Sequence, residues 1–301
     1  MKSYTELRAE YGDLSFNTST ANLTEGDKYM NDRYRKILAS HAWSFLDRKV
    51  EVDTVAATQT TPLPGDMDKL TTLTVTVGTT IYTPRYIPSK KFFNMIASIT
   101  SFQSDIPTMF TIFAGSMYLW PIPSSSGNTI TFLYRRRVKA LSSADYTTGT
   151  ISTADLDDAT ITGSGTSWNT GMANKYIKIA DANTANLGDG IWYEIGSVTD
   201  TTHLELFSPY LGTDITAGTA TYTIGDVPVL PEGFQDIILW EPLAQYWYAH
   251  GDKDLADQYK KRDAEDFAML MSSFGDETDD VVLDNGNPID IINPNLVVEL
   301  Q

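Results

Sequence analysis

Apolar residues recur at helical spacing near both ends of the chain. The longer run covers residues 231–274 and consists of two apolar stretches around a polar elbow, His250-Gly251-Asp252. Because residues three and four apart share one helix face, this pattern predicts either a kinked helix or a helical hairpin with one buried stripe. Pro231 suits a first helical position. Pro242 lies inside the first stretch, where it removes one backbone hydrogen bond and should kink the helix.

The predicted partner of this stripe is the other long helical run, residues 24–49. Thr24 is its expected N-cap, and apolar side chains follow at helical spacing up to Leu46. We expect Trp43 to be buried near Trp247 or Phe267. A shorter helix is also predicted directly after Ser3, since Ser3-Tyr4-Thr5-Glu6 matches a capping box.

Between these helical ends the hydrophobic period changes to two, and threonine and β-branched residues alternate, which is typical of strands. Residues 87–93 fit the start of either a helix or a strand. Residues 109–120 have the pattern of a hairpin around Gly115-Ser116. The other strands predicted in this part are residues 50–54, 73–77 and 129–138, with Ile130, Phe132 and Tyr134 on one face of the last.

Residues 147–223 are dense in Thr, Ser and Gly and sparse in Lys and Arg. Short strands separated by turn residues indicate a small antiparallel barrel or sandwich there, with Trp168 and Trp192 in its core. The predicted strands are residues 159–161, 176–179, 192–198, 203–207 and 220–224.

These patterns predict an α+β fold with three parts. Residues 1–145 and 227–275 form a helical body with β segments, and residues 146–226 form an inserted β-module. Residues 276–301 form an acidic tail that cannot bury enough surface to order itself. Its apolar positions alternate near the end, so we expect an interaction arm that adds a strand to a partner sheet. The arm candidates are Ile289, Ile291, Ile292, Leu296, Val297, Val298 and Leu300.

The chain has a formal net charge of −17 and no cysteine. Such an acidic chain should not wrap nucleic acid, because phosphate neutralisation supplies most non-specific affinity. Disulfides are excluded. No apolar run is long enough for a membrane span, and the charged start is unlike a secretory signal.

No motif predicts catalysis, a cofactor or a metal site. The sequence contains no P-loop, no dinucleotide-binding glycine pattern and no zinc-protease motif. His41, His203 and His250 are scattered. Residues 155–158 are the best calcium candidate, but they lack the regularly spaced oxygen ligands of a Ca²⁺ loop, so a solvated acidic turn is favoured. Residues 135–137 are three consecutive arginines that alternate faces on a strand, so they should pair with carboxylates rather than form one patch.

Several sequence motifs lie on both flanks of the predicted β-module and share a family pattern. One motif begins at Gly115 and continues through two strand residues to Pro-x-Pro and then Leu-x-Tyr. The stretches are YTELR (4–8), YMNDRYRKI (29–37), WSFL (43–46), FAGSMYLWPIP (113–123), TITFLYRRR (129–137), LPEGF (230–234) and the Gly251-Asp252 elbow. Together they resemble the head–tail adaptor (connector) proteins of tailed bacteriophages. The chain departs from that pattern at Val138, where a proline is expected, and at Pro242.

This resemblance implies a structural virion protein without enzymatic activity. It implies a ring, twelve copies in number, docked under the portal protein, assembled in the bacterial cytoplasm. Double-stranded DNA would pass through it, and tail or nozzle proteins would attach below. Candidates to line this channel or its rim, for which a solvated helix face is the alternative, are Asp252, Asp254, Asp257, Glu265 and Asp266. Two alternatives remain open at this point: another virion tail protein, and a receptor- or carbohydrate-binding protein suggested by the aromatic residues and the β-module.

Overall fold

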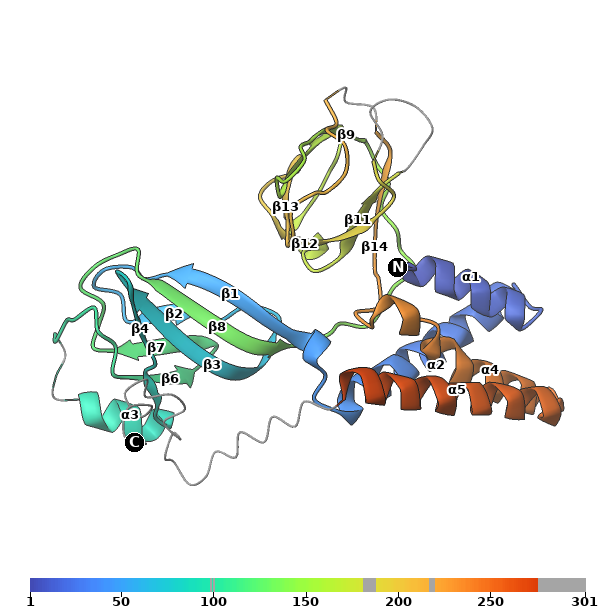
Figure 1. Cartoon of the computed structure of the whole chain (residues 1–301), viewed down its shortest axis with the longest axis horizontal. Helices are drawn as coiled ribbons and strands as arrows, with labels where there is room; N and C mark the ends of the chain where they lie inside the picture. Colours follow the sequence, from blue (N-terminus) through green and yellow to red (C-terminus); the bar gives the residue numbers. More distant parts are fainter. Residues whose placement is uncertain (98, 100, 181–187, 217–219, 276–301) are drawn as a thin grey trace, which may run out of the picture. The chain divides into compact units, whose positions relative to one another are not determined.

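The computed structural model describes residues 1–97, 99, 101–180, 188–216 and 220–275 (Figure 1). These residues form two compact units. One combines Met1–His41 with residues 139–275, and the other is the continuous stretch Ala42–Val138. Helices and mostly antiparallel sheets occupy separate parts of the chain, which confirms the predicted α+β class. The predicted boundaries at residues 145/146 and 226/227 stay predictions.

The first unit begins with two helices, α1 (Tyr4–Leu14) and α2 (Thr20–Ser40). The capping box of α1 is present as predicted: Ser3 Oγ accepts the Glu6 N–H at 3.2 Å, and Glu6 Oε2 accepts the Ser3 N–H at 2.7 Å. The two helices pack closely at Gly26. A Cβ added there would lie 2.4 Å from the ring of Tyr11, which is too close. Glycine at this position therefore permits the α1–α2 packing.

The predicted bounds of the second helix are wrong at both ends. Ser19, rather than Thr24, is the N-cap. The helix ends at Ser40, since His41 has an extended backbone (φ −151°, ψ 165°). A 3-10 turn and strand β1 (Asp47–Asp53) follow. The apolar residues before β1 have helical spacing, but β1 pairs with a strand far along the chain. This tertiary pairing outweighs the local preference for helix.

The C-terminal run is a helical hairpin, one of the two predicted alternatives. A 3-10 turn, η3 (Glu232–Phe234), precedes α4 (Ile237–Ala249), and α5 (Lys253–Phe274) follows the elbow, where Gly251 has a φ of +87°. α4 continues past Pro242 and contacts α1, α2 and α5, so helices from both chain ends pack together. The buried apolar side chains of the hairpin include Ile237, Ile238, Leu239, Trp240, Leu243, Ala244, Ala256 and Leu270.

The same unit contains one curled antiparallel sheet in the order β14-β11-β12-β13-β10-β9. Its edges are joined by backbone bonds: the Ile151 N–H donates to Ala220 O, and the Tyr146 N–H donates to Ile224 O, both at 2.8 Å. The strands are β9 (Thr150–Ala154), β10 (Thr160–Ser164), β11 (Tyr176–Ile179), β12 (Trp192–Val198), β13 (His203–Leu206) and β14 (Tyr222–Gly225). β11 and β12 have the predicted bounds, β10, β13 and β14 differ from them by a few residues, and β9 was not predicted.

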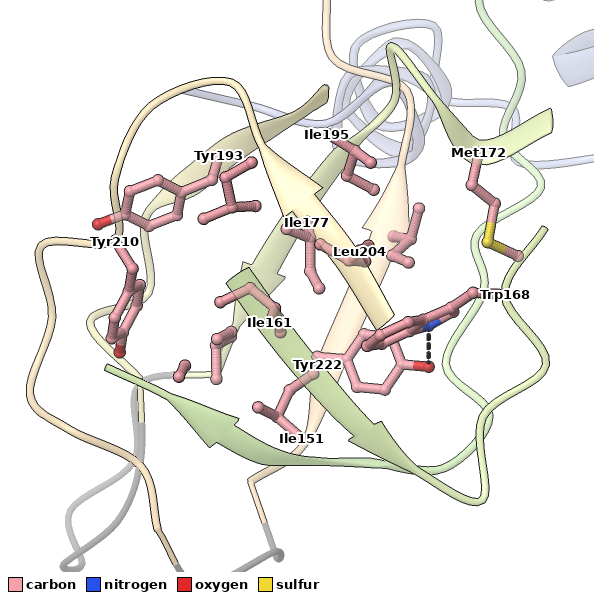
Figure 2. Close-up of a cluster of buried hydrophobic side chains, with 14 of the residues drawn as sticks. Ile151, Ile161, Trp168, Met172, Ile177, Tyr193, Ile195, Leu204, Tyr210 and Tyr222 are labelled. Atoms are coloured by element: carbon pink, nitrogen blue, oxygen red, sulfur yellow. Dashed lines mark hydrogen bonds between the residues drawn. The ribbon is translucent and has the colours of Figure 1, made fainter. Parts of the chain in front are cut away.

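Aromatic and aliphatic side chains fill the inside of this curled sheet (Figure 2). Trp168, which precedes the 3-10 turn η2 (Thr170–Met172), is 1% exposed, and its Nε1 donates to the Tyr222 hydroxyl at 2.9 Å. Trp168 is therefore the core anchor that the sequence predicted. Trp192 is also buried, but in a separate cluster with Tyr176 and Val227.

The second unit, Ala42–Val138, holds two sheets, β1-β8-β3-β4 and β2-β7-β6-β5, and a helix, α3. Both sheets contribute to one core, and Ile130, Phe132 and Tyr134 are fully buried on one face of β8, as predicted. The remaining elements are η1 (Ser44–Leu46), β2 (Thr60–Pro62), β3 (Met67–Val77), β4 (Thr80–Tyr82), β5 (Arg85–Tyr86), α3 (Ser89–Ile96), β6 (Met109–Phe113), β7 (Ser116–Trp120) and β8 (Thr129–Arg136).

Three local expectations concern this unit. The β6–β7 hairpin is present, and its turn residues Ala114 and Gly115 have positive φ values of 51° and 77°, as tight hairpin turns require. The open choice after Ile87 is decided in favour of a helix, α3. Trp43 is fully buried and stacks on Phe45 with ring centroids 5.4 Å apart. Its predicted proximity to Trp247 or Phe267 stays a prediction.

Candidate interaction surfaces

Four of the five acidic channel candidates lie on the exposed face of α5 or at its start. Asp252 is the N-cap, and its Oδ1 accepts the Leu255 N–H at 3.0 Å. Asp254 lies in the first turn, where the helix dipole favours negative charge. Asp257 and Glu265 are 3.9 Å and 3.7 Å from lysines on the same helix. Both carboxylates remain accessible to solvent. Such exposed pairs add little stability.

Asp266, the fifth candidate, has a different environment. Its Oδ2 accepts the Nε1–H of Trp240 at 2.7 Å, and Trp240 is only 2% exposed. The ring of Trp240 also stacks on Tyr259 and lies 3.9 Å from the guanidinium carbon of Arg262. Asp266 therefore joins α5 to α4. That any of these five residues lines a channel or its rim stays a prediction.

An ion-pair network connects α2 to the C-terminal hairpin. Arg33 forms a two-point contact with Asp263, with Nε to Oδ1 at 3.1 Å and Nη2 to Oδ2 at 2.8 Å. Glu241 Oε2 lies 3.5 Å from Arg33, and Glu241 Oε1 accepts from Lys36 at 3.0 Å. Burial raises the pKa of Asp263, and Arg33 opposes that rise. Sequence reasoning missed this pair, because no local pattern links residues 230 positions apart.

Polar contacts attach the curled sheet to α1. The Tyr4 N–H donates to Asp226 O at 2.8 Å. Lys178 lies 3.6 Å from Glu6, and Lys175 lies 3.5 Å from Asp226. The side chains of both ion pairs are partly exposed, so screening weakens the pairs. The junction is therefore held mainly by polar groups and the small Trp192 cluster.

We expect the β-module to be replaceable. In a variant in which a short Gly/Ser linker replaces residues 146–226, the helices should stay folded. A short linker is sufficient, since the Tyr146 backbone is bonded to Ile224 across the gap. Helical circular dichroism should persist, because the lost surface ion pairs each contribute only about 0–1 kcal/mol. Aggregation or loss of the helical signal would contradict the prediction.

A buried charged group stabilises the second unit. Arg48 Nη1 lies 2.8 Å from Asp66 Oδ2, and the Tyr134 hydroxyl donates to Asp66 Oδ1 at 2.6 Å. The side chains of Arg48 and Asp66 are 7% and 12% exposed. Burial raises the pKa of the Tyr134 hydroxyl, and the bond to Asp66 adds to that rise. This arrangement joins β1, β8 and the loop before β3.

The three consecutive arginines do not form a single patch. Arg135 and Arg136 are half-buried on β8, whereas Arg137 is exposed and lies 4.0 Å from Asp68. The Arg137 N–H also donates to Asp66 O. The predicted pairing with carboxylates is therefore seen at Arg137.

The basic surface that stands out in this unit was not predicted. Lys90, Lys91, Asn94 and Met95 line a shallow depression of about 440 Å³ on the outer side of α3. On the inner side, Phe93 packs against Phe113 of β6, with ring centroids 5.5 Å apart. The sequence signal of this depression was the adjacent lysines followed directly by Phe92 and Phe93.

No metal site is found among the described residues. The calcium candidate, residues 155–158, lies between β9 and β10, and Asp158 Oδ1 accepts the Thr160 N–H at 2.9 Å. His203 bonds Asp200 at 2.9 Å, and His250 Nδ1 lies 2.8 Å from Tyr246 O. These side chains therefore take part in local turns and helix ends.

The predicted arm lies outside the described residues. Its candidates Ile289, Ile291, Ile292, Leu296, Val297, Val298 and Leu300 all follow residue 275, the last one described.

Comparison with known families decides the class of the molecule. Residues 2–164 match a family described as SU10 adaptor protein, which is more than half of the chain. The chain belongs to this family. It is thus a structural phage adaptor protein. The match overlaps the resemblance expected over residues 1–140, whereas the resemblance expected over residues 228–275 lies beyond it. No curated protein matches the chain.

The residues that match the adaptor family cover only part of the fold. It contains α1, α2, the whole unit Ala42–Val138 and the strands β9 and β10. The helical hairpin α4–α5 lies beyond it. None of the described helices of this adaptor is both long and apolar enough to cross a membrane.

Proposed function

We propose that this phage adaptor works at the head–tail interface of a tailed bacteriophage, as a ring below the portal protein. Its membership of the SU10 adaptor family carries the proposal. Twelve copies surround a channel for double-stranded DNA, and tail or nozzle proteins attach to the opposite side. The ring assembles in the bacterial cytoplasm and remains in the virion.

The fold supports a role in assembly. The two units, one of which contains the curled sheet, offer separate surfaces to partners. The acidic balance, −17 overall, lets DNA pass without lasting contacts, because few cations are present to replace its counterions. The exposed carboxylates on α5 are the proposed wall or rim.

Electron microscopy tests the proposal. The purified protein, mixed with the portal protein of the same phage, should give rings attached coaxially to portal rings. The protein without portal is the control for self-association. Particles that never combine with portal, or that bind host cells instead, would contradict the proposed function.

We predict that the assembled ring binds linear double-stranded DNA weakly, even at low salt. Repulsion from exposed carboxylates is strongest there, since the Debye length reaches about 30 Å at 0.01 M. A filter or mobility-shift assay measures this. Asp254→Lys with Asp257→Lys should give tighter, steeply salt-dependent binding, as added phosphate contacts release counterions.

The matched control is Asp155→Lys with Asp158→Lys, which changes the same charge on the curled sheet. If both double variants bind DNA equally, the α5 carboxylates do not line the channel. Tight binding by the unchanged ring would point instead to Arg135–Arg137 as phosphate contacts.

We also predict that residues 276–301 act as an interaction arm. The arm contains no Lys or Arg, so a protease specific for acidic residues is the suitable probe. Cleavage should be fast in the free protein and slow after assembly with portal. Removing residues 285–301 should weaken docking and leave the unfolding of the described fold unchanged. Equal cleavage rates in the two states would contradict the arm.

A further inference from the structure

Aromatic rings gather at one end of the helices in the first unit, where the α1–α2 loop meets the end of α4 (Figure 1). Phe16 of the loop is 85% exposed, and its ring packs edge-on against Trp247 with ring centroids 6.0 Å apart. Trp247 packs against Tyr246 at 5.3 Å, and Tyr246 packs against Tyr11 of α1 at 6.5 Å. The four rings therefore form one continuous row that begins in solvent.

Phe16 has a backbone conformation that glycine usually supplies. Its φ is +51°. It occupies the position after the C-cap of α1 in a Schellman motif: the Phe16 N–H donates to Asp13 O at 3.1 Å, and the Asn17 N–H donates to Gly12 O at 3.0 Å. A bulky side chain is strained at this φ, and burial of the ring does not offset the strain. Strained residues of this kind cluster at functional sites, so the exposed ring points to an interaction surface.

A pocket of about 300 Å³ opens beside this row, and the α1–α2 pair and α4 both line it. Its lining side chains include Tyr11, Glu25, Tyr29, Tyr246 and His250. The Tyr29 hydroxyl donates to Glu25 Oε1 at 3.1 Å. Burial raises the pKa of Tyr11 to about 12, and the nearby charge of Glu25 adds to that rise. The pocket thus combines three tyrosine rings with one carboxylate.

The carboxylate of Glu25 has no cationic partner in the described part of the chain. No Lys or Arg described there lies within 4.0 Å of it, although Lys28 is one turn further along α2. The two helix ends at the pocket, the start of α2 and the end of α4, have dipoles of opposite sign that offset each other. The charge of the carboxylate is therefore available to a ligand.

A guanidinium group suits this pocket, because it stacks on aromatic rings and also pairs with a carboxylate. We propose that this end of the first unit binds a segment of a partner protein in which an arginine stands next to an apolar residue. The arginine enters the pocket and pairs with Glu25, and the apolar residue covers Phe16. A protein segment is favoured over a small cation, since the row of rings extends the surface beyond the pocket to Phe16. The inference requires neither a ring nor a portal protein.

A peptide titration of the full chain tests this binding. The probe is acetyl-Leu-Arg-Leu amide, and the control probe has citrulline, a neutral analogue of the same shape, in place of arginine. NMR spectra of ¹³C-labelled tyrosine rings are recorded at about pH 8, where histidine side chains are generally neutral. The Tyr29 and Tyr246 signals should shift saturably, with a Kd in the millimolar range. The citrulline peptide should bind at least about tenfold more weakly, since it lacks the charge.

Two variants separate the pocket from general attraction of a cationic peptide to a chain of net charge −17. Glu25→Gln should weaken binding at least about tenfold. Asp32→Asn removes the same charge from an exposed position of the same helix and should change it less than about twofold. Equal effects of the two variants, equal affinity for both peptides, or no saturable shift would each overturn the proposal.

Phe16→Gly tests the role of the strained residue. It should weaken peptide binding about fivefold through lost apolar contact. The urea midpoint of the helical signal should stay the same or rise, because glycine adopts this φ without strain. Unchanged affinity, or a clearly lower midpoint, would show that the ring serves the fold and not a partner, and would overturn the proposal.

Discussion

Replacing Trp43 with alanine should lower the free energy of unfolding by roughly 3–5 kcal/mol, the usual cost of emptying a large aromatic site. Trp43 is fully buried and stacks on Phe45. It also lies in the connection between the end of α2 and the start of β1. Urea titration followed by far-ultraviolet circular dichroism measures the loss.

The control for Trp43 is Tyr86→Ala, which removes an aromatic side chain of the same unit that is 54% exposed. It should cost less than about 1 kcal/mol, because a surface substitution leaves no cavity. Trp43→Phe should lie between the two. A cost for Trp43→Ala as small as that of the control would mean that the burial of Trp43 is not maintained in solution.

Replacing Asp66 with alanine should destabilise the second unit by about 3 kcal/mol or more, as expected when one partner of a buried ion pair is removed. The carboxylate forms an ion pair with Arg48 at 2.8 Å and accepts a hydrogen bond from the Tyr134 hydroxyl at 2.6 Å. One substitution therefore removes both contacts. The guanidinium of Arg48 stays buried after the change. The midpoint of urea unfolding should fall accordingly.

Asp68 provides a matched control two residues away. Its side chain is 56% exposed and lies 4.0 Å from Arg137, so Asp68→Ala should cost only about 0–1 kcal/mol. Tyr134→Phe removes one hydrogen bond to a charged group and should cost about 1.5–3 kcal/mol. If the Asp66 and Asp68 variants unfold at the same urea concentration, the buried group contributes no special stability.

Local signals in the sequence were read correctly where the structure depends on nearby residues. The capping box of Ser3 and Glu6 fixes the start of α1 within one turn. Strands β11 and β12 have the predicted bounds, since turn residues interrupt the chain on both sides. The β6–β7 hairpin is also present, although its turn lies at Ala114-Gly115, one residue before the predicted Gly115-Ser116.

Expectations failed where distant pairing decides the conformation. The helix predicted to continue to residue 49 stops at Ser40, and β1 pairs with β8 in a register that joins Asp47 to Arg135. β9 was missed for a different reason: it pairs with the next strand, β10, but only Ile151 and Ala154 face the interior, so its apolar pattern is too sparse to show alternation.

The candidate site was only partly readable for a similar reason. Charge patterning selected five acidic residues near the elbow, but it could not show that Asp266 bonds Trp240 while Asp254 faces solvent. Nor could it pair Arg33 with Asp263, or show that Lys90 and Lys91 line one depression with Met95. Side-chain direction and long-range partners come from packing, which a linear pattern does not contain.

The division of the chain into one continuous and one discontinuous unit sets an order for events on the ribosome. Ala42–Val138 has all its strands once residue 138 has emerged, since β1 and β8 pair with each other. α1 and α2 must wait for α4 and α5, and the Arg33–Asp263 contact spans 230 residues. At synthesis rates of about 5–20 residues per second, that wait lasts roughly 10–50 s. During this interval Met30, Tyr34 and Ile37 lack the hairpin that covers them, and helices of this length are marginal alone in water. The nascent chain therefore carries a finished unit behind an unfinished N-terminal segment, which is the stretch that cellular chaperones would meet first.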